Sequence, residues 1–223
     1  MKILFLGTGA ADFPQDKTGV VGFRRTASVL IDEKILIDPG PWVLDAIEEY
    51  GVDVSKIKYI LNTHLHDDHY CQKTVDYLVS QGAQFIETKD KDVLTLDEYT
   101  VEAYKGNHTI EVCHFIIKDG KKCLFYALDG AWLQYEEILA VWKNKPDLAV
   151  FDATVGFIEK DWRVFEHNNL QMVIEMKKSI DTDIKQYVIS HMAYTLHTDH
   201  DTLSAEMEKH GFVTAYDGLE MEF

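Results

Sequence analysis

The stretch Thr63-His64-Leu65-His66-Asp67-Asp68-His69 directly follows the apolar, strand-like residues 57–61, and it decides how the chain is interpreted. Imidazole nitrogens and carboxylate oxygens are the ligands that Zn²⁺, Mn²⁺ and Fe²⁺ accept from a protein. Alternate side chains of an extended segment point to the same side, so His64 and His66 can face one ion. Asp68 and His69 follow the turn and can face a second ion. The order of these residues, at the end of a strand, disfavours a polar loop that is rich in histidine by chance.

Three further metal-capable side chains stand where an apolar segment ends. His108 follows a strand-like segment, Asp129 ends residues 123–128, and His191 ends residues 187–190. A carboxylate such as Asp129 can bridge two ions with its two oxygens. Each residue alone could equally cap a turn. Together with the first motif they supply two sets of ligands, which favours metal binding.

The composition is that of a globular enzyme-sized chain. With 223 residues, 46% of them hydrophobic, it can bury the core of a single domain covering residues 1–223. The three cysteines are widely spaced and form no C-x-x-C pair, which indicates free thiols in a reducing compartment. The apolar segment after Lys2 is too short for a signal peptide, and no later segment reaches the length of a membrane span. We therefore expect a cytoplasmic protein without a membrane partner.

The net charge of −16, from 22 basic and 38 acidic residues, disfavours long nucleic acids, whose phosphates an acidic surface repels. A small anionic substrate held by metal ions remains compatible with this charge. The charge can also serve solubility alone. The sequence leaves a homodimer open.

Hydrophobic periodicity predicts alternating strands and helices, with most of residues 84–129 in strands. The expected helices, whose apolar faces include Val43, Ala46 and Ile47 in the first and Val75, Leu78 and Val79 in the second, span residues 42–50, 71–81, 135–143, 168–179 and 199–210. The other expected strands span residues 2–6, 27–38 (a hairpin turning at Asp32-Glu33), 57–61, 147–152, 186–190, 212–216 and a short segment from 219. This order suggests an α+β fold in which two packed sheets have helices outside, a four-layer αββα sandwich, although periodicity alone leaves it as one α+β candidate among several.

With these residues in place, the sequence resembles the metallo-β-lactamase superfamily of binuclear metallohydrolases over essentially its whole length. The segments Leu6-Gly7-Thr8-Gly9 and Leu36-Ile37-Asp38-Pro39-Gly40 add to the metal motif. The resemblance implies the αββα fold and two divalent metal ions, Zn²⁺ or Mn²⁺, with Fe²⁺ also compatible. It implies one ion on His64, His66 and His108, and a second on Asp68, His69 and His191. Asp129 would lie between them.

Two features select among branches of that superfamily. The antibiotic-hydrolysing branch has a cysteine among the ligands of its second metal and lacks the Asp bridge, so we do not expect a β-lactamase. The oxygen-reducing di-iron branch typically has Glu where this chain has His66. That difference favours hydrolysis.

The sequence is most similar to the phosphodiesterase branch that includes the phosphonate-pathway cyclic phosphodiesterase. The segments that carry this resemblance are Phe23-Arg24-Arg25-Thr26-Ala27-Ser28, Glu166-His167-Asn168-Asn169-Leu170, Val188-Ile189-Ser190-His191 and Ala215-Tyr216-Asp217-Gly218-Leu219-Glu220. That enzyme has an N-terminal cysteine cluster for a structural zinc, and residues 10–22 here contain no cysteine. The structural zinc is therefore not expected, and the substrate can differ.

The predicted function is hydrolysis of a small phosphodiester, cyclic substrates included, by a metal-bridged hydroxide. Asp68 would orient that hydroxide. The resemblance implies that His167 contacts the phosphate, where it could also protonate the leaving group. His167 could instead cap or pack a helix start. Tyr194 could bind substrate or pack against the wall of the site.

Three neighbouring residues of the predicted site have other expected roles. Asp38 is expected to orient a ligating histidine. Arg24 and Arg25 could meet an anion, although a solvated pair is the favoured interpretation. The remaining histidines, namely His114, His197, His200 and His210, are expected to be surface or hydrogen-bonded structural residues.

Three rival functions remain. A thioester or lactone hydrolase of the same fold would use Tyr194 to polarise a carbonyl group. A tRNA 3′-processing nuclease would need a basic arm, which the sequence lacks. A non-catalytic metal-binding module is disfavoured by the complete set of candidate ligands.

Overall fold

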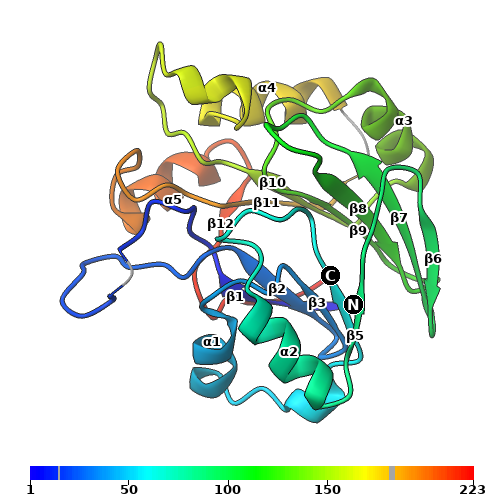
Figure 1. The fold of residues 1–223 in the computed structure, drawn as a ribbon. Coiled ribbons are helices and arrows are strands. Elements are labelled where there is room, and N and C mark those ends of the chain that lie inside the picture. The colour runs from blue at the N-terminus through cyan, green and yellow to red at the C-terminus, as the bar shows by residue number, and fades with distance from the viewer. Residues whose placement is uncertain (15, 181–183) are drawn as a thin grey trace.

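Two mixed β-sheets pack face to face in the structure, a computed structural model that describes residues 1–14, 16–180 and 184–223 (Figure 1). The first sheet contains, in spatial order, β13 (Glu220–Glu222), β1 (Lys2–Gly7), β2 (Ser28–Ile31), β3 (Ile35–Ile37), β4 (Tyr59–Leu61) and β5 (Gln84–Ile86). The second contains β12 (Val213–Thr214), β11 (Gln186–Ser190), β10 (Leu148–Asp152), β9 (Cys123–Ala127), β8 (Cys113–Lys118), β7 (Tyr99–Lys105) and β6 (Val93–Leu96).

Helices cover the outer faces of the two sheets, which confirms the predicted αββα sandwich (Figure 1). Helices α1 (Val43–Glu49) and α2 (Gln72–Ser80) lie beside the first sheet, and α3 (Tyr135–Asn144) and α4 (Leu170–Ile180) lie beside the second. Helix α5 (His200–Glu208) precedes β12 and packs against it. Short 3₁₀ turns at Val54–Lys56 and Trp162–Phe165 were not expected from the sequence.

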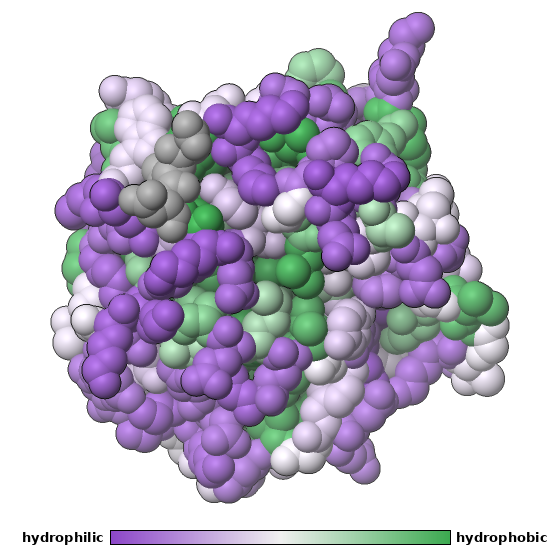
Figure 2. All heavy atoms as spheres, turned by 180° about the vertical axis from the view of Figure 1, so that it is seen from behind, coloured by the Kyte–Doolittle hydropathy of each residue, from purple (hydrophilic) through white to green (hydrophobic). Residues whose placement is uncertain are grey.

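Three apolar clusters hold these layers together. The largest joins the inner faces of both sheets, and its fully buried members include Phe5, Phe115 and Tyr126. A second cluster fills the space between the second sheet and its helices, and a third lies between the first sheet and its helices. Burial of apolar side chains on both faces of each sheet explains why most strands are continuous apolar segments. Figure 2 shows that hydrophilic residues dominate the face opposite to that of Figure 1.

The hairpin expected around Asp32-Glu33 is present. Both residues adopt left-handed backbone angles, with φ of 47° and 58°, and the Lys34 N–H donates to the Ile31 carbonyl oxygen, as in a type I′ β-turn. The prediction for the second helix was partly wrong, because Val79 is 46% exposed. The buried stripe of α2 is centred on Thr74, Val75 and Leu78, and Val79 lies at its edge. No helix in the three described ranges has the length and apolarity needed to cross a membrane.

Candidate metal centre

The predicted metal-binding residues come together where the carboxyl ends of strands from both sheets meet. The loop after β4 carries His64, His66, Asp68 and His69, while the other three residues follow β7, β9 and β11 in the second sheet. Their potential ligand atoms form groups in which every atom lies within 4.8 Å of the others. These groups include His64, His66 and His108; Asp68, His69 and His191; and His64, His69 and Asp129.

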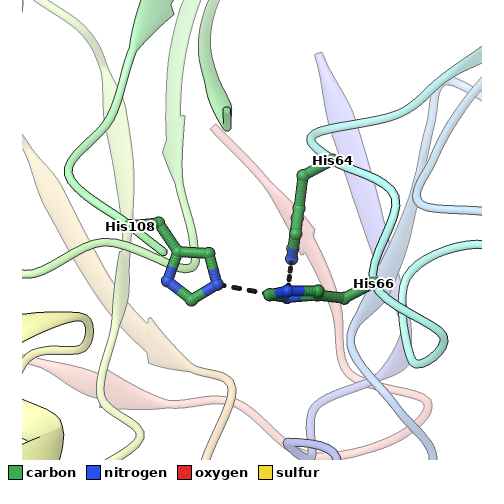
Figure 3. A group of neighbouring side chains, drawn as sticks. All are labelled: His64, His66 and His108. Atoms are coloured by element: carbon green, nitrogen blue, oxygen red, sulfur yellow. Dashed lines mark hydrogen bonds between the residues drawn. The ribbon is translucent and has the colours of Figure 1, made fainter. Parts of the chain in front are cut away.

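The first group consists of three histidines whose ring nitrogens converge (Figure 3). Nε2 of His64 lies 2.9 Å from Nδ1 of His66, and Nε2 of His108 lies 3.2 Å from the same atom. In the second group, Nε2 of His69 lies 3.1 Å from Nε2 of His191. A tetrahedral site with metal–nitrogen distances of about 2.0–2.1 Å has nitrogen–nitrogen edges of about 3.3 Å. The observed spacings therefore suit nitrogens that share an ion.

The outer nitrogens of two of these histidines are held by the chain. Oδ2 of Asp38 lies 2.9 Å from Nδ1 of His69, as expected for a carboxylate that orients this ring. Oδ1 of Asp38 accepts hydrogen bonds from the backbone N–H and the hydroxyl of Thr63. The Thr63 hydroxyl in turn lies 2.9 Å from Nδ1 of His64. Asp38 therefore fixes both rings so that their Nε2 atoms face inward.

The Nδ1 atoms of His108 and His191, on the other side of the centre, are also held by oxygen atoms of the chain. Nδ1 of His108 lies 3.0 Å from the Glu166 carbonyl oxygen, and Nδ1 of His191 lies 2.7 Å from the Thr154 hydroxyl. Each Nδ1–H can donate to its oxygen, which leaves the lone pair of Nε2 directed into the centre. This tautomer is the one a metal-binding imidazole needs.

Asp129 lies between the two groups and is buried. Its Oδ2 atom lies 2.8 Å from Nε2 of His69 and 3.3 Å from Nε2 of His191, yet among the described residues it has no hydrogen-bond partner of acceptable geometry. A buried, unsatisfied carboxylate oxygen is costly unless a cation completes its environment. Asp38 and Asp68 add two more carboxylates, and no lysine or arginine of the described chain pairs with any of these three.

The electrostatics of the centre favour metal-binding protonation states for His64, Asp68 and Asp129 but not for His69. Burial lowers the pKa of His69, but Asp129, Asp38 and Asp68 raise it well above its usual value, so a divalent ion has to displace a proton from this ring. Burial lowers the pKa of His64 to about 2, so its ring is neutral. Burial alone would raise the pKa of Asp68 and of Asp129, but the neighbouring imidazoles hold both well below the usual range of a carboxyl group. Neutral imidazoles and ionised carboxylates are the forms that bind divalent cations. The donor set therefore fits divalent metal ions.

Several site residues adopt a left-handed backbone conformation. The φ angles are 63° for Asp38, 56° for Asp129 and 60° for His191. Such angles are unfavourable for residues other than glycine and persist only where the surrounding structure fixes them. Here each residue ends or follows a buried strand and turns its side chain back into the centre. Two candidate ligands and the carboxylate that orients His69 are thus among the described residues with left-handed backbone angles.

His167 lies beside the centre, with its ring close to those of His108 and His191 at centroid distances of 5.0 and 5.5 Å. Its Nδ1 atom lies 2.9 Å from Oδ2 of Asp152 and therefore donates to that carboxylate. Its Nε2 atom makes no hydrogen bond within the described ranges. Burial lowers the pKa of His167, but Asp152 and then Asp129 raise it more, to about 9. The ring is thus held as an imidazolium whose Nε2–H is unused.

Asp152 is the site residue that sequence analysis missed. It is fully buried at the end of β10 and accepts hydrogen bonds from the backbone N–H groups of Thr154, Asn168 and Asp129. The signal was present, because β10 is an apolar strand that ends on a carboxylate, like the strand before Asp129.

The other predicted residues are placed as follows. Tyr194 is 41% exposed, packs its ring on Phe13 and lines a cavity beyond His191, an arrangement that allows either of its expected roles. Among the remaining histidines, His114 is buried between Glu137 and the Leu128 carbonyl oxygen, in agreement with a structural role.

The favoured interpretation of Arg24 and Arg25 as a solvated pair was wrong. Both are buried, with 9% and 4% of their surface exposed. The guanidinium of Arg25 forms ion pairs with Asp45 and Glu49, which lie about one helix turn apart on α1. Arg24 forms a different set of contacts, described below.

Comparison with known proteins agrees with this architecture. The sequence model of the metallo-beta-lactamase superfamily matches residues 21–72, which include the histidine motif. The metallo-beta-lactamase fold protein YhfI from Bacillus subtilis aligns with 100% of this chain and 99% of its own, at 18% identity and a TM-score of 0.77. This chain is a metallo-β-lactamase-fold protein.

Other solved structures share the fold. A diphosphatase from the PhnP family covers 100% of this chain and 97% of its own, at 17% identity and a TM-score of 0.72. Zn²⁺-bound PqqB from Methylobacterium extorquens covers 100% of both chains, at 14% identity and a TM-score of 0.78. Among curated proteins, none matches the sequence significantly.

Proposed function

We propose that this protein is a metal-dependent hydrolase that cleaves a small, including a cyclic, phosphodiester. His64, His66 and His108 would hold one divalent ion, and Asp68, His69 and His191 a second, with Asp129 shared between them. When bound, two such ions supply positive charge that stabilises a phosphoryl group and lowers the pKa of water. Zn²⁺ and Mn²⁺ are the ions we favour, and Fe²⁺ suits the same ligands.

The observation that carries the phosphodiesterase proposal is the position of His167 beside the candidate ligands and its hydrogen bond to Asp152. Asp152 fixes the ring through Nδ1, and the unused Nε2–H lies beside the cluster of candidate ligands. A fixed imidazolium can donate a hydrogen bond to a phosphoryl oxygen and deliver its proton to the departing alkoxide. Proton transfer of this kind contributes about 10²–10⁴-fold to a rate. A PhnP-family protein that shares the fold is a diphosphatase, so the fold is compatible with cleavage of a phosphorus–oxygen bond.

The test is hydrolysis of bis-p-nitrophenyl phosphate by the metal-loaded protein and by His167→Ala. We expect turnover to fall about 10²-fold in the variant, because the hydrogen bond from Nε2–H to a phosphoryl oxygen is lost. The p-nitrophenolate leaving group departs without a proton, so this substrate tests the phosphate contact. The metal content should stay unchanged, because His167 is not among the proposed ligands. Unchanged turnover, or loss of bound metal, would contradict the proposed role.

A lactone or thioester hydrolase is the second candidate. It is favoured by Tyr194, which is half-exposed three residues after His191 and whose hydroxyl forms no hydrogen bond in the described part of the chain. A phenol so placed could polarise a carbonyl group. Hydrolysis of an acyl-homoserine lactone in preference to bis-p-nitrophenyl phosphate would favour this candidate.

The partner that we propose is a small anionic molecule in a cytoplasmic setting. The net charge of −16 supports a small ligand over a long nucleic acid, because phosphates along a polymer would meet a largely acidic surface.

A further inference from the structure

A cavity of about 370 Å³ lies between the segment joining β1 to β2 and the segment joining β11 to α5. We call it the Arg24 cavity. Ligand pockets in proteins usually occupy about 300–1,000 Å³, so this cavity is large enough for a small organic group. Its lining combines basic, acidic and aromatic side chains, namely Arg24 and His200, Asp199 and Asp217, and Phe13, Phe23, Tyr194 and Tyr216. Both carboxylates already accept hydrogen bonds, Asp199 from Thr202 and Asp217 from Thr8 and from the backbone N–H of Arg25.

Arg24 is a buried cation that lacks a direct ionic partner. Its Nη1 atom donates to the Thr8 hydroxyl and to the Ala215 carbonyl oxygen, and its Nη2 atom lies 3.1 Å from Nδ1 of His200. No carboxylate of the described residues forms an ion pair with this guanidinium. The carboxylate of Asp217 is reached only through the Thr8 hydroxyl, which donates to it.

The carboxylate of Asp217 is also shared. It accepts a hydrogen bond from the backbone N–H of Arg25 and lies 3.7 Å from the Arg25 guanidinium. Arg25 therefore has three carboxylates around it, whereas Arg24 is connected to a single carboxylate, and only through the Thr8 hydroxyl. Burial lowers the pKa of Arg24, and the charge of Asp217 opposes that shift only in part.

A guanidinium has five N–H donors, and three bonds are accounted for here. Burying a cation is costly unless it is paired, and arginine is well suited to a planar oxyanion because its donors form a fixed fork. The aromatic rings of Phe13 and Tyr194, packed at a centroid distance of 5.1 Å, give the same cavity an apolar wall. The lining is thus complementary to an anionic group joined to a flat apolar group.

We propose that the Arg24 cavity binds an organic oxyanion joined to an apolar, planar group, as a second recognition point for the substrate. Tyr194 links the two sites, because it lines the cavity and lies three residues, or about 10 Å of extended chain at most, beyond His191. That the bound molecule is the substrate rests on the proposed function. The binding of an oxyanion in the Arg24 cavity is independent of it.

His200 offers a matched pair of variants. It is the first residue of α5 and is only partly buried, and an acidic residue is favourable in the first turn of a helix. In His200→Asp a carboxylate oxygen takes the position of Nδ1, since both atoms are one bond beyond Cγ, and it supplies the missing counter-ion to Arg24. His200→Asn has the same shape without the charge.

The experiment is calorimetric titration of the metal-loaded protein with benzoate and, separately, with phenyl phosphate. We expect His200→Asp and Arg24→Met to bind benzoate at least about tenfold more weakly than the wild type, the loss typical of a charge-assisted hydrogen bond. His200→Asn should bind within about threefold of the wild type. Arg163→Met, which removes an arginine paired with Asp161, controls for net charge and should not change binding.

The two probes separate the chemical sources. Phenyl phosphate binding that persists in His200→Asp belongs to the metal centre, and the part that is lost belongs to the cavity. If His200→Asp weakens the binding of both probes, the cavity is a general oxyanion site. If it weakens the binding of benzoate alone, the cavity is a carboxylate site. Absence of benzoate binding in the wild type, or equal binding by His200→Asp and His200→Asn, overturns the proposal.

The same proteins separate this proposal from the proposed function. If benzoate binding behaves as expected but no variant or wild-type protein hydrolyses bis-p-nitrophenyl phosphate, the cavity stands and the phosphodiesterase function fails. If the wild type hydrolyses the ester but shows no binding that depends on His200, the function stands and the cavity proposal fails.

Discussion

Replacing Asp152 with Asn should weaken both the fold and the activity, because this buried carboxylate connects three parts of the centre. Oδ1 accepts from the backbone N–H groups of Thr154 and Asn168. Oδ2 accepts from the Asp129 backbone N–H, from the Thr154 hydroxyl and from Nδ1 of His167. An asparagine that keeps its oxygen at the first position turns an NH₂ group towards the donors at the second.

The cost follows from those contacts. The Thr154 hydroxyl can rotate to accept from the new NH₂ group, but the Asp129 backbone N–H loses its acceptor, which costs about 1–3 kcal/mol for a buried donor. The charge-assisted bond from His167 is also lost, and the ring gives up its Nδ1 proton so that Nδ1 can accept from the NH₂ group, a further loss of about 1 kcal/mol. The free energy of unfolding should therefore fall by about 2–4 kcal/mol. For a chain of this length the melting temperature should drop by about 5–15 °C.

The assays are urea unfolding at constant metal concentration and turnover of bis-p-nitrophenyl phosphate. Turnover should fall about 10–100-fold, the range seen when a residue that orients an active-site group is removed. Asp97→Asn is the control, because this exposed carboxylate accepts from the side chains of Lys58 and Tyr59, far from the centre in sequence and fold, and Asn tolerates its left-handed backbone. A loss below about 1 kcal/mol together with unchanged turnover would refute the role assigned to Asp152.

Two further predictions concern groups outside the centre. Burial lowers the pKa of His114, but the contact with Glu137 raises it above its ordinary value of 6.5, so the charged pair stabilises the fold below pH 6.5 and this contribution is lost as the pH rises through the raised pKa. The stability difference between wild type and Glu137→Gln, measured by urea unfolding, should therefore be larger at pH 6 than at pH 9, and an equal difference would contradict the pairing. Iodoacetamide at pH 8 should modify the partly exposed Cys71 first, because burial raises the pKa of Cys113 to about 11 and of Cys123 to about 12; mass spectrometry showing early modification of either buried thiol in the folded protein would contradict this order.

The fold and much of the centre could be predicted because their signals are local. Apolar strands alternating with amphipathic helices made the αββα sandwich one α+β candidate among several, and the resemblance to a known superfamily selected it. The first four candidate ligands lie within one short segment, residues 64–69. His108, Asp129 and His191 were found by one rule, a metal-capable residue where a buried strand ends. The same rule applied to β10 would have found Asp152.

The surroundings of the arginines could not be predicted, because they depend on contacts between distant parts of the chain. Asp45 and Glu49 reach Arg25 from α1, and Asp217 approaches it from the other end of the sequence. Local composition around Arg24 and Arg25 shows two adjacent charges before a strand, which resembles an exposed pair. Only tertiary packing shows that Arg25 is enclosed by carboxylates and that Arg24 lines a cavity.

The central claim is that this chain builds a binuclear metal centre with Asp129 between the two ions. The most direct measurement is the metal content of the purified protein after saturation with Zn²⁺ or Mn²⁺ and removal of free metal, by plasma mass spectrometry, for wild type and Asp129→Ala. The account predicts two equivalents per chain in the wild type and fewer than two in the variant. One equivalent or less in the wild type, or two full equivalents retained by Asp129→Ala, would contradict it.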